Sequence, residues 1–323
     1  MEAAPLLSLP EVPAPAGAQP EWFRGPDGAR LRAVLFPAVG TARGSVVVSP
    51  GRTEPFEKYF EVVDELRARG FTVLAHDWRG QGRSARWLAD PQKSHARGWR
   101  PFLADFRTLL DTYEARLPKP WITMGHSMGG GLSVLALSEG EPRFAGAVMT
   151  SPMLGLRMGG RPEPLVQAVA WFMTLIGRAG EYVYSPEERR EDAANGWKIL
   201  THDRARWDRY KTQIAAAPEL LVDGFTWGWL AFALTLTFRI EKMPGVERIA
   251  IPLVFVAAQH DHLCTNRAQR AVVARAKRGR FVEIPGAFHE VLMEGDVRRA
   301  VFWEAFDALA DEVAPPMAAA KIG

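Results

Sequence analysis

The spacing of hydrophobic residues alternates between two patterns along most of the chain. Short apolar runs typical of buried strands cover residues 45–48, 71–74, 121–124, 144–149, 252–257 and 281–284. Helical spacing of apolar residues covers about 53–70, then 102–113, 267–277 and 297–309. Strands that alternate with helices of this length predict βαβ units, and therefore an α/β fold with a mostly parallel sheet.

The two ends of the chain show a different pattern. Residues 1–20 contain five prolines and few large apolar side chains, which predicts a flexible arm. The segment Gly25–Gly28 reads Gly-Pro-Asp-Gly between two strand-like runs, so we expect a hairpin there. We expect residues 313–323 to form a flexible tail.

The alternation stops between about Met153 and Arg248. This region has helical patterns, no clear strand, and five of the eleven tryptophans of the chain. Because a strand pattern resumes at Ile251, we interpret residues 153–248 as a helical insertion between two strands. The core is then formed by residues 21–152 and 249–312.

Composition narrows the class of protein. Hydrophobic residues make up 47% of the chain and charged residues 24%, which fits a globular protein. The net charge of +3 is too near balance to suggest a nucleic-acid partner. A single cysteine, Cys264, excludes a disulfide framework and a Cys-rich metal site. No secretory signal opens the chain and no apolar run reaches about 18 residues, so we expect a cytoplasmic protein.

A candidate nucleophile lies in the Gly-x-Ser-x-Gly motif of residues 125–129. The motif directly follows one predicted strand and opens a predicted helix, which is the context of a nucleophile elbow. Such a turn lifts the hydroxyl of Ser127 above the sheet edge. Gly125 and Gly129 carry no side chain, so the strand and the helix can pass close together. The alternative is a glycine-rich strand-to-helix turn without chemistry.

A serine needs a base, and the candidate partners follow in the order Ser, acid, His that this architecture favours. Asp261 comes just after the strand at 252–257, and His289 follows the strand at 281–284. Both therefore lie at the carboxyl ends of strands, where ligand sites of parallel sheets collect. We expect His289 to act as general base and then acid, and Asp261 to fix its tautomer.

The other histidines are weaker candidates. His260 and His262 adjoin the acid, and His126 is expected to pack between helix and sheet. We interpret three more as surface or structural residues: His76, His95 and His202. A zinc site from His260, Asp261 and His262 is a minor alternative, because no further His or Cys cluster accompanies them.

Two backbone N–H groups are candidates for the oxyanion hole. The N–H of Met128 lies at the start of the predicted helix, where the helix dipole is positive. The loop after the strand at 45–48 reads Ser-Pro-Gly-Arg, and the N–H of Arg52 is the second candidate. A simple Pro-Gly turn is the alternative for this loop.

Together these segments resemble an α/β-hydrolase of the lysophospholipase and monoacylglycerol lipase group. The matching segments are 49–54, 77–84, 125–130, 261–264 and 288–290. Pro50-Gly51-Arg52 stands where many members have His-Gly-x-Gly, which makes the chain especially similar to bacterial lysophospholipases. The resemblance implies a sheet of about eight strands, a helical cap over the serine, and hydrolysis of carboxylic esters without a cofactor. We interpret residues 77–84 as a structural turn after a strand, whose glycines and arginines hold the loop below the site.

The insertion bears on the substrate. Residues 165–173 and 220–238 are rich in large apolar side chains, which would suit an acyl chain or contact with a membrane surface. Packing of the cap on its own domain is the alternative. The 13 basic and 12 acidic residues of the insertion give no strong preference for an anionic head group, and Arg52 is the one cation expected near a phosphate.

We therefore predict a serine hydrolase of single-chain lipid esters. A broad carboxylesterase, an aminopeptidase-like hydrolase and a non-catalytic binding protein are the alternatives. The oligomeric state is left open.

Overall fold

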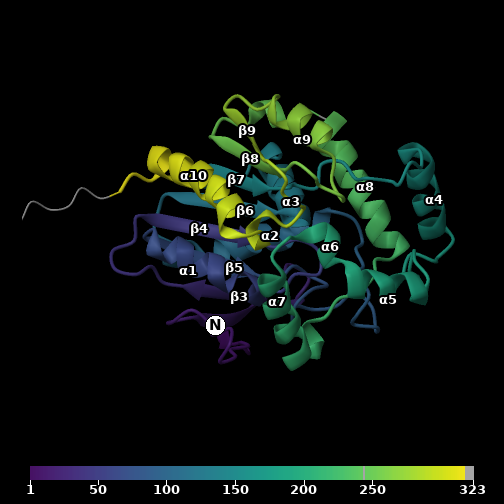
Figure 1. Ribbon diagram of the computed structural model, residues 1–323, viewed down its shortest axis with the longest axis horizontal. Coiled ribbons are helices and arrows are strands. Elements are labelled where there is room, and N and C mark those ends of the chain that lie inside the picture. The colour runs from purple at the N-terminus through teal and green to yellow at the C-terminus, as the bar shows by residue number, and fades with distance from the viewer. Residues whose placement is uncertain (243, 317–323) are drawn as a thin grey trace, which may run out of the picture.

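One mixed sheet runs through the centre of the molecule. The computed structural model describes residues 1–242 and 244–316, and in this part of the chain nine strands follow the order β1-β2-β3-β5-β4-β6-β7-β8-β9 (Figure 1). Their bounds are Glu2–Ala3 (β1), Gln19–Arg24 (β2), Arg30–Phe36 (β3), Gly44–Ser49 (β4), Phe71–His76 (β5), Trp121–His126 (β6), Phe144–Thr150 (β7), Leu253–Ala258 (β8) and Gly279–Ile284 (β9). Neighbours from β5 to β9 pair in parallel, whereas β1, β2, β3 and β5 are joined antiparallel. The predicted mostly parallel sheet and its N-terminal hairpin are confirmed.

The central strands are covered on both faces, which explains their continuous apolar sequences. Every residue of β4, β5, β6 and β8 is buried. Along β4, Val46 and Val48 pack with α1 (Phe60–Ala68) and α10 (Asp296–Val313) on one face. Val47 packs on the other face with α2 (Arg100–Tyr113), α3 (Ser127–Ser138) and α9 (Asn266–Val273). The sheet is therefore the middle of three layers.

The first helix begins later than its spacing predicts. A 3₁₀ turn at Phe56–Tyr59 precedes α1, and the backbone φ of Thr53 is +66°, outside any helical range. The Thr53 hydroxyl donates to the carbonyl of Arg52 at 2.6 Å and caps no helix. The loop after β4 is thus longer than expected, and it adjoins the candidate site.

Residues 1–20 differ from the flexible arm that their prolines predict. Residues of β1 pair with β2, and the N–H of Ala4 donates to the carbonyl of Pro20 at 2.9 Å. The guanidinium of the fully buried Arg32 donates to the carbonyl of Pro5 at 3.0 Å. Several small apolar side chains pack on the core beside α1 and α10: Leu6, Val12, Ala14 and Ala18. The segment lies on the body because it supplies both apolar cover and a buried hydrogen-bond acceptor.

At the other end of the chain, the predicted tail at 313–323 begins with the last residue of α10. Ala314 follows that helix and is buried. Residues 317–323 lie outside the described part of the chain.

Five helices lie between β7 and β8 in the described part of the insertion. They are α4 (Glu163–Leu175), α5 (Pro186–Asn195), α6 (Trp197–Leu200), α7 (Arg204–Ala216) and α8 (Trp227–Lys242). Much of α8 is buried and packs on α3, in the same core as the strands. In α7, Arg206 forms ion pairs with Glu61 of α1 at 2.7 Å and Asp296 of α10 at 2.5 Å. By contrast, α4 lies at the periphery, with Ala170 as its buried residue (Figure 1).

A membrane-spanning helix is not found among the described residues, because none of their helices is both long and apolar enough to cross a bilayer.

Candidate active site

Ser127 lies at the sharp junction where β6 ends at His126 and α3 begins. Its φ is +48°, an uncommon value for a residue with a side chain. The neighbouring glycines make this junction possible. A Cβ at Gly129 would lie 2.2 Å from the carbonyl oxygen of Ser49, and one at Gly125 would lie 2.7 Å from the Cα of Gly130. The loop after β4 thus passes directly against the first turn of α3.

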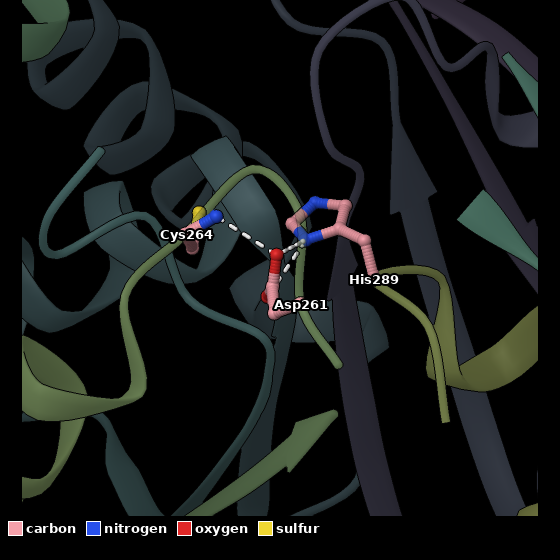
Figure 2. A group of neighbouring side chains, drawn as sticks. All are labelled: Asp261, Cys264 and His289. Atoms are coloured by element: carbon pink, nitrogen blue, oxygen red, sulfur yellow. Dashed lines mark hydrogen bonds and ion pairs between the residues drawn. The ribbon is translucent and has the colours of Figure 1, made fainter. Parts of the chain in front are cut away.

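Ser127, His289 and Asp261 come together at this edge of the sheet. His289 Nε2 is 3.0 Å from the hydroxyl oxygen of Ser127, and its Nδ1 is 2.9 Å from both carboxylate oxygens of Asp261. Asp261 Oδ1 also accepts the N–H groups of Leu263 and Cys264, each at 2.8 Å, and Figure 2 shows the bond from Cys264. The carboxylate therefore has three hydrogen-bond partners, and it fixes the orientation of the imidazole ring.

Burial and the partner's charge shift the pKa values of His289 and Asp261 in opposite directions. Burial by itself lowers the pKa of His289, but the Asp261 carboxylate outweighs it and raises that pKa above 6.5, aided by Glu290 and Glu54. Burial raises the pKa of Asp261, yet the His289 ring and the two N–H donors lower it below its usual value. Asp261 therefore stays ionised, and His289 can accept a proton more readily than an ordinary imidazole.

The remaining histidines have other partners. His126 is buried with Nδ1 3.0 Å from the hydroxyl of Thr150, and burial lowers its pKa to about 4, so it is neutral. His260 and His262 are exposed beside the buried Asp261. Three others are hydrogen-bonded away from Ser127: His76 to Ser49, His95 to Thr226 and His202 to Glu294.

The loop after β4 is held from several directions. The N–H of Gly51 donates to Glu54 Oε2 at 2.6 Å. The side chain of Gln81 accepts from the N–H of Thr53 at 2.6 Å and donates to the carbonyl of Gly51 at 2.9 Å. Trp78 Nε1 donates to the carbonyl of Pro50 at 2.8 Å. Residues 77–84 thus support the loop, through side chains that sequence reasoning did not single out.

The two candidate oxyanion donors lie on elements that meet at Gly129. Met128 is the second residue of α3, so its N–H is among those with no acceptor within the helix. Arg52 lies on the neighbouring loop. Its guanidinium donates to the carbonyl of Asp223 at 3.1 Å and lies over the rings of Phe225 and Trp229. That side chain therefore contacts the insertion, which weakens the expectation that it meets a phosphate.

Three potential metal ligands cluster here among the described residues: Asp261, Cys264 and His289 (Figure 2). Two of them are already hydrogen-bonded to each other. Burial raises the pKa of the Cys264 thiol well above its usual value, whereas a metal requires the thiolate. The cluster is better suited to proton transfer than to metal binding.

The mixed sheet, the serine turn at its centre and the adjacent histidine and carboxylate place the chain in the α/β-hydrolase class. More particularly, the chain belongs to the family described as serine aminopeptidase, S33, whose model matches residues 40–296.

Individual relatives support this assignment. Lysophospholipase L2 of Escherichia coli strain K12 is 31% identical over 292 residues, covering 86% of this chain and 83% of the relative. The monoglyceride lipase of Homo sapiens is 30% identical over 282 residues, covering 86% of each chain. The fold matches a soluble variant of the Saccharomyces cerevisiae monoglyceride lipase with a TM-score of 0.72 at 17% identity, over 91% of this chain and 95% of that one. The resemblance inferred from the motifs is confirmed.

Replacing Gly129 with Ala tests the close passage at the elbow. The new Cβ would overlap backbone oxygen atoms that cannot rotate away, so we expect the free energy of unfolding to fall by at least about 3 kcal/mol. Gly295→Ala is the control, because a Cβ there meets no atom within 4 Å and the φ is −62°. Equal stability of the two variants in urea titrations would contradict the prediction.

The pH dependence of catalysis tests the electrostatics of His289. The base must be neutral to accept the serine proton, and its pKa is raised, so activity should be lost as pH falls through a value above 6.5. We expect kcat/KM for an uncharged ester to show this acid limb. The rate of labelling by a fluorophosphonate should follow the same curve. A limb at or below 6.5 would show that Asp261 does not dominate the environment of the imidazole.

Proposed function

We propose that this protein hydrolyses the carboxylic esters of single-chain lipids, with Ser127 as nucleophile. The observation that carries the proposal is the continuous hydrogen-bonded line from Ser127 through His289 to Asp261. A serine hydroxyl becomes an effective nucleophile only when a base takes its proton, and His289 Nε2 lies at hydrogen-bond distance for that transfer.

The steps follow from this geometry. The Ser127 oxygen attacks the ester carbonyl as its proton passes to His289, and the Asp261 carboxylate stabilises the resulting imidazolium. The N–H groups of Arg52 and Met128 would face the oxyanion. The alcohol leaves with the proton from His289, and an acyl-enzyme remains. A water molecule then gives up a proton to His289 and attacks the acyl-enzyme; His289 passes that proton to the Ser127 oxygen as the fatty acid leaves.

The substrate class is supported by the relatives and by the insertion. The relatives are named lysophospholipases and monoacylglycerol or monoglyceride lipases, and both substrates carry one acyl chain on a polar alcohol. The insertion contributes many apolar side chains above the sheet edge, among them Phe225 and Trp229 beside the Arg52 loop. The family description names an aminopeptidase, so amide hydrolysis is the second candidate.

Fatty-acid release from matched substrates tests the proposal. We expect turnover of a lysophosphatidylcholine or a monoacylglycerol with the same acyl chain, and no detectable turnover by Ser127→Ala. His289→Ala should lower kcat by roughly 10³ or more. Activity on short esters alone would indicate a general carboxylesterase, and release from an aminoacyl anilide would favour the peptidase. A folded protein that reacts neither with esters nor with a fluorophosphonate would contradict the proposal that the protein is a serine hydrolase.

We propose further that α4 rests on a lipid surface. Five of its apolar residues, and the residue that directly follows the helix, are between 40% and 84% exposed: Leu165, Val169, Trp171, Phe172 and Leu175, then Ile176. Transfer of exposed apolar side chains of this size from water into the interface of a bilayer is favourable, because it lowers the free energy. Contact there would place the insertion where single-chain lipids are taken up.

Partition into phosphatidylcholine vesicles tests the role of α4. The triple variant Trp171→Ser, Phe172→Ser and Leu175→Ser should bind at least about tenfold more weakly than the wild type, because three large apolar side chains are removed. Val297→Ser is the matched control, since Val297 is 88% exposed on α10, outside the insertion. Equal partition of all three proteins would exclude α4 as the contact.

A further inference from the structure

A buried cation lies between two buried carboxylates next to the candidate active site. Lys58 Nζ is 2.7 Å from Glu54 Oε1 and 2.7 Å from Glu290 Oε2, and the three side chains are at most 8% exposed. Lys58 belongs to the 3₁₀ turn before α1, and it takes no part in the hydrolytic steps above. Its two ion pairs nevertheless connect it to the loop of Arg52 and to the loop of His289.

Each carboxylate belongs to a different loop of the site. Glu54 Oε2 accepts the N–H of Gly51 at 2.6 Å, directly before Arg52, and the hydroxyl of Tyr59 at 2.6 Å. Glu290 directly follows His289, and its N–H donates to the carbonyl of Leu200 at 2.8 Å. The Lys58 ammonium therefore joins the loop of a candidate oxyanion donor to the loop of the candidate base.

The insertion closes this cluster from the outside. The ring of Tyr210 from α7 lies 5.0 Å from Lys58 Nζ, and its hydroxyl donates to the carbonyl of Thr53 at 3.2 Å. The cavity that Glu54, Lys58 and Glu290 help to line has a volume of about 10 Å³, room for roughly one water molecule. A substrate cannot enter, so Lys58 can influence the reaction only through the groups that it holds.

A buried ion pair such as that of Lys58 does not by itself explain stability. Taking a charge out of water costs several kcal/mol, and apolar residues of similar volume often replace buried ion pairs without loss of stability. Burial raises the pKa of Glu54, but the charge of Lys58 outweighs it and lowers that pKa to about 2, so this carboxylate is ionised. Burial likewise opposes the charge of Lys58, yet Glu290 and Glu54 raise its pKa. The ammonium is thus a fixed charge between two loops.

We propose that Lys58 is a positioning residue for the hydrolytic reaction, setting the distance between the loop of Arg52 and the loop of His289. The proposal rests on the function proposed above. Misplacement of a catalytic group by about 1 Å can cost on the order of 10² in rate, so loosening this joint should act on catalysis rather than on substrate binding.

The test compares Lys58→Met with Lys58→Arg and with a control in a partly buried ion pair far from Ser127. Arg143→Met is that control, because Arg143 pairs with Glu141 at 2.6 Å just before β7, at the edge of the sheet opposite to Ser127. Active sites are counted by complete labelling with a fluorophosphonate, and rates are measured well below the melting temperature. For Lys58→Met we expect kcat per active site to fall by about 10² with KM changed less than about threefold. Lys58→Arg should return to within about tenfold of wild type, and Arg143→Met should keep the wild-type kcat.

The outcomes separate the proposals. If folded Lys58→Met keeps the wild-type kcat, or if Arg143→Met loses as much, the positioning role is overturned. If Lys58→Met does not fold, Glu290→Gln replaces it, since it leaves the Lys58–Glu54 pair intact and removes one link alone. A lower kcat at unchanged KM then supports the role, and a wild-type kcat overturns it. A wild-type protein that neither reacts with the fluorophosphonate nor cleaves esters overturns the proposed function, and the inference with it.

Discussion

The site depends on the close approach of two backbone segments at Gly129. The loop after β4 passes so near the first turn of α3 that a single Cβ would lie 2.2 Å from the carbonyl oxygen of Ser49. Parallel pairing sets up this approach, because Ser49 at the end of β4 is opposite Gly125 near the end of β6. The nucleophile candidate and the loop of Arg52 therefore meet at one edge. A side chain at Gly129 would push them apart.

Ion pairs and hydrogen bonds then stabilise the loops of Asp261 and His289 at the carboxyl edge of the sheet. Asp261 and His289 follow the neighbouring strands β8 and β9, and each is buried where an isolated charge would be costly. They are stable there because they satisfy each other, and because backbone N–H groups complete the carboxylate shell. The same principle applies to Lys58, which forms ion pairs with both Glu54 and Glu290. Buried ion pairs therefore connect the loop of Arg52 with the loop of His289.

The insertion divides into a fixed part and an exposed part. Its α7 is tied to α1 and α10 through Arg206, and α8 packs into the core beside α3. These helices behave as an extension of the body, and Tyr210 even covers the Lys58 cluster. In contrast, α4 exposes most of its apolar side chains. The same inserted segment therefore supplies both a structural support for the site loops and an exposed apolar surface.

The sequence by itself determined the alternation of strands and helices, because buried strands and amphipathic helices leave local periodic patterns. It also placed Ser127, Asp261 and His289 in loops at strand ends, since parallel strands share one carboxyl edge. Only the tertiary structure decided that residues 1–20 pack on the body, that the guanidinium of Arg52 contacts the insertion, and that Lys58 joins two loops. These contacts link residues far apart in the chain, and pairing across such distances follows no local spacing.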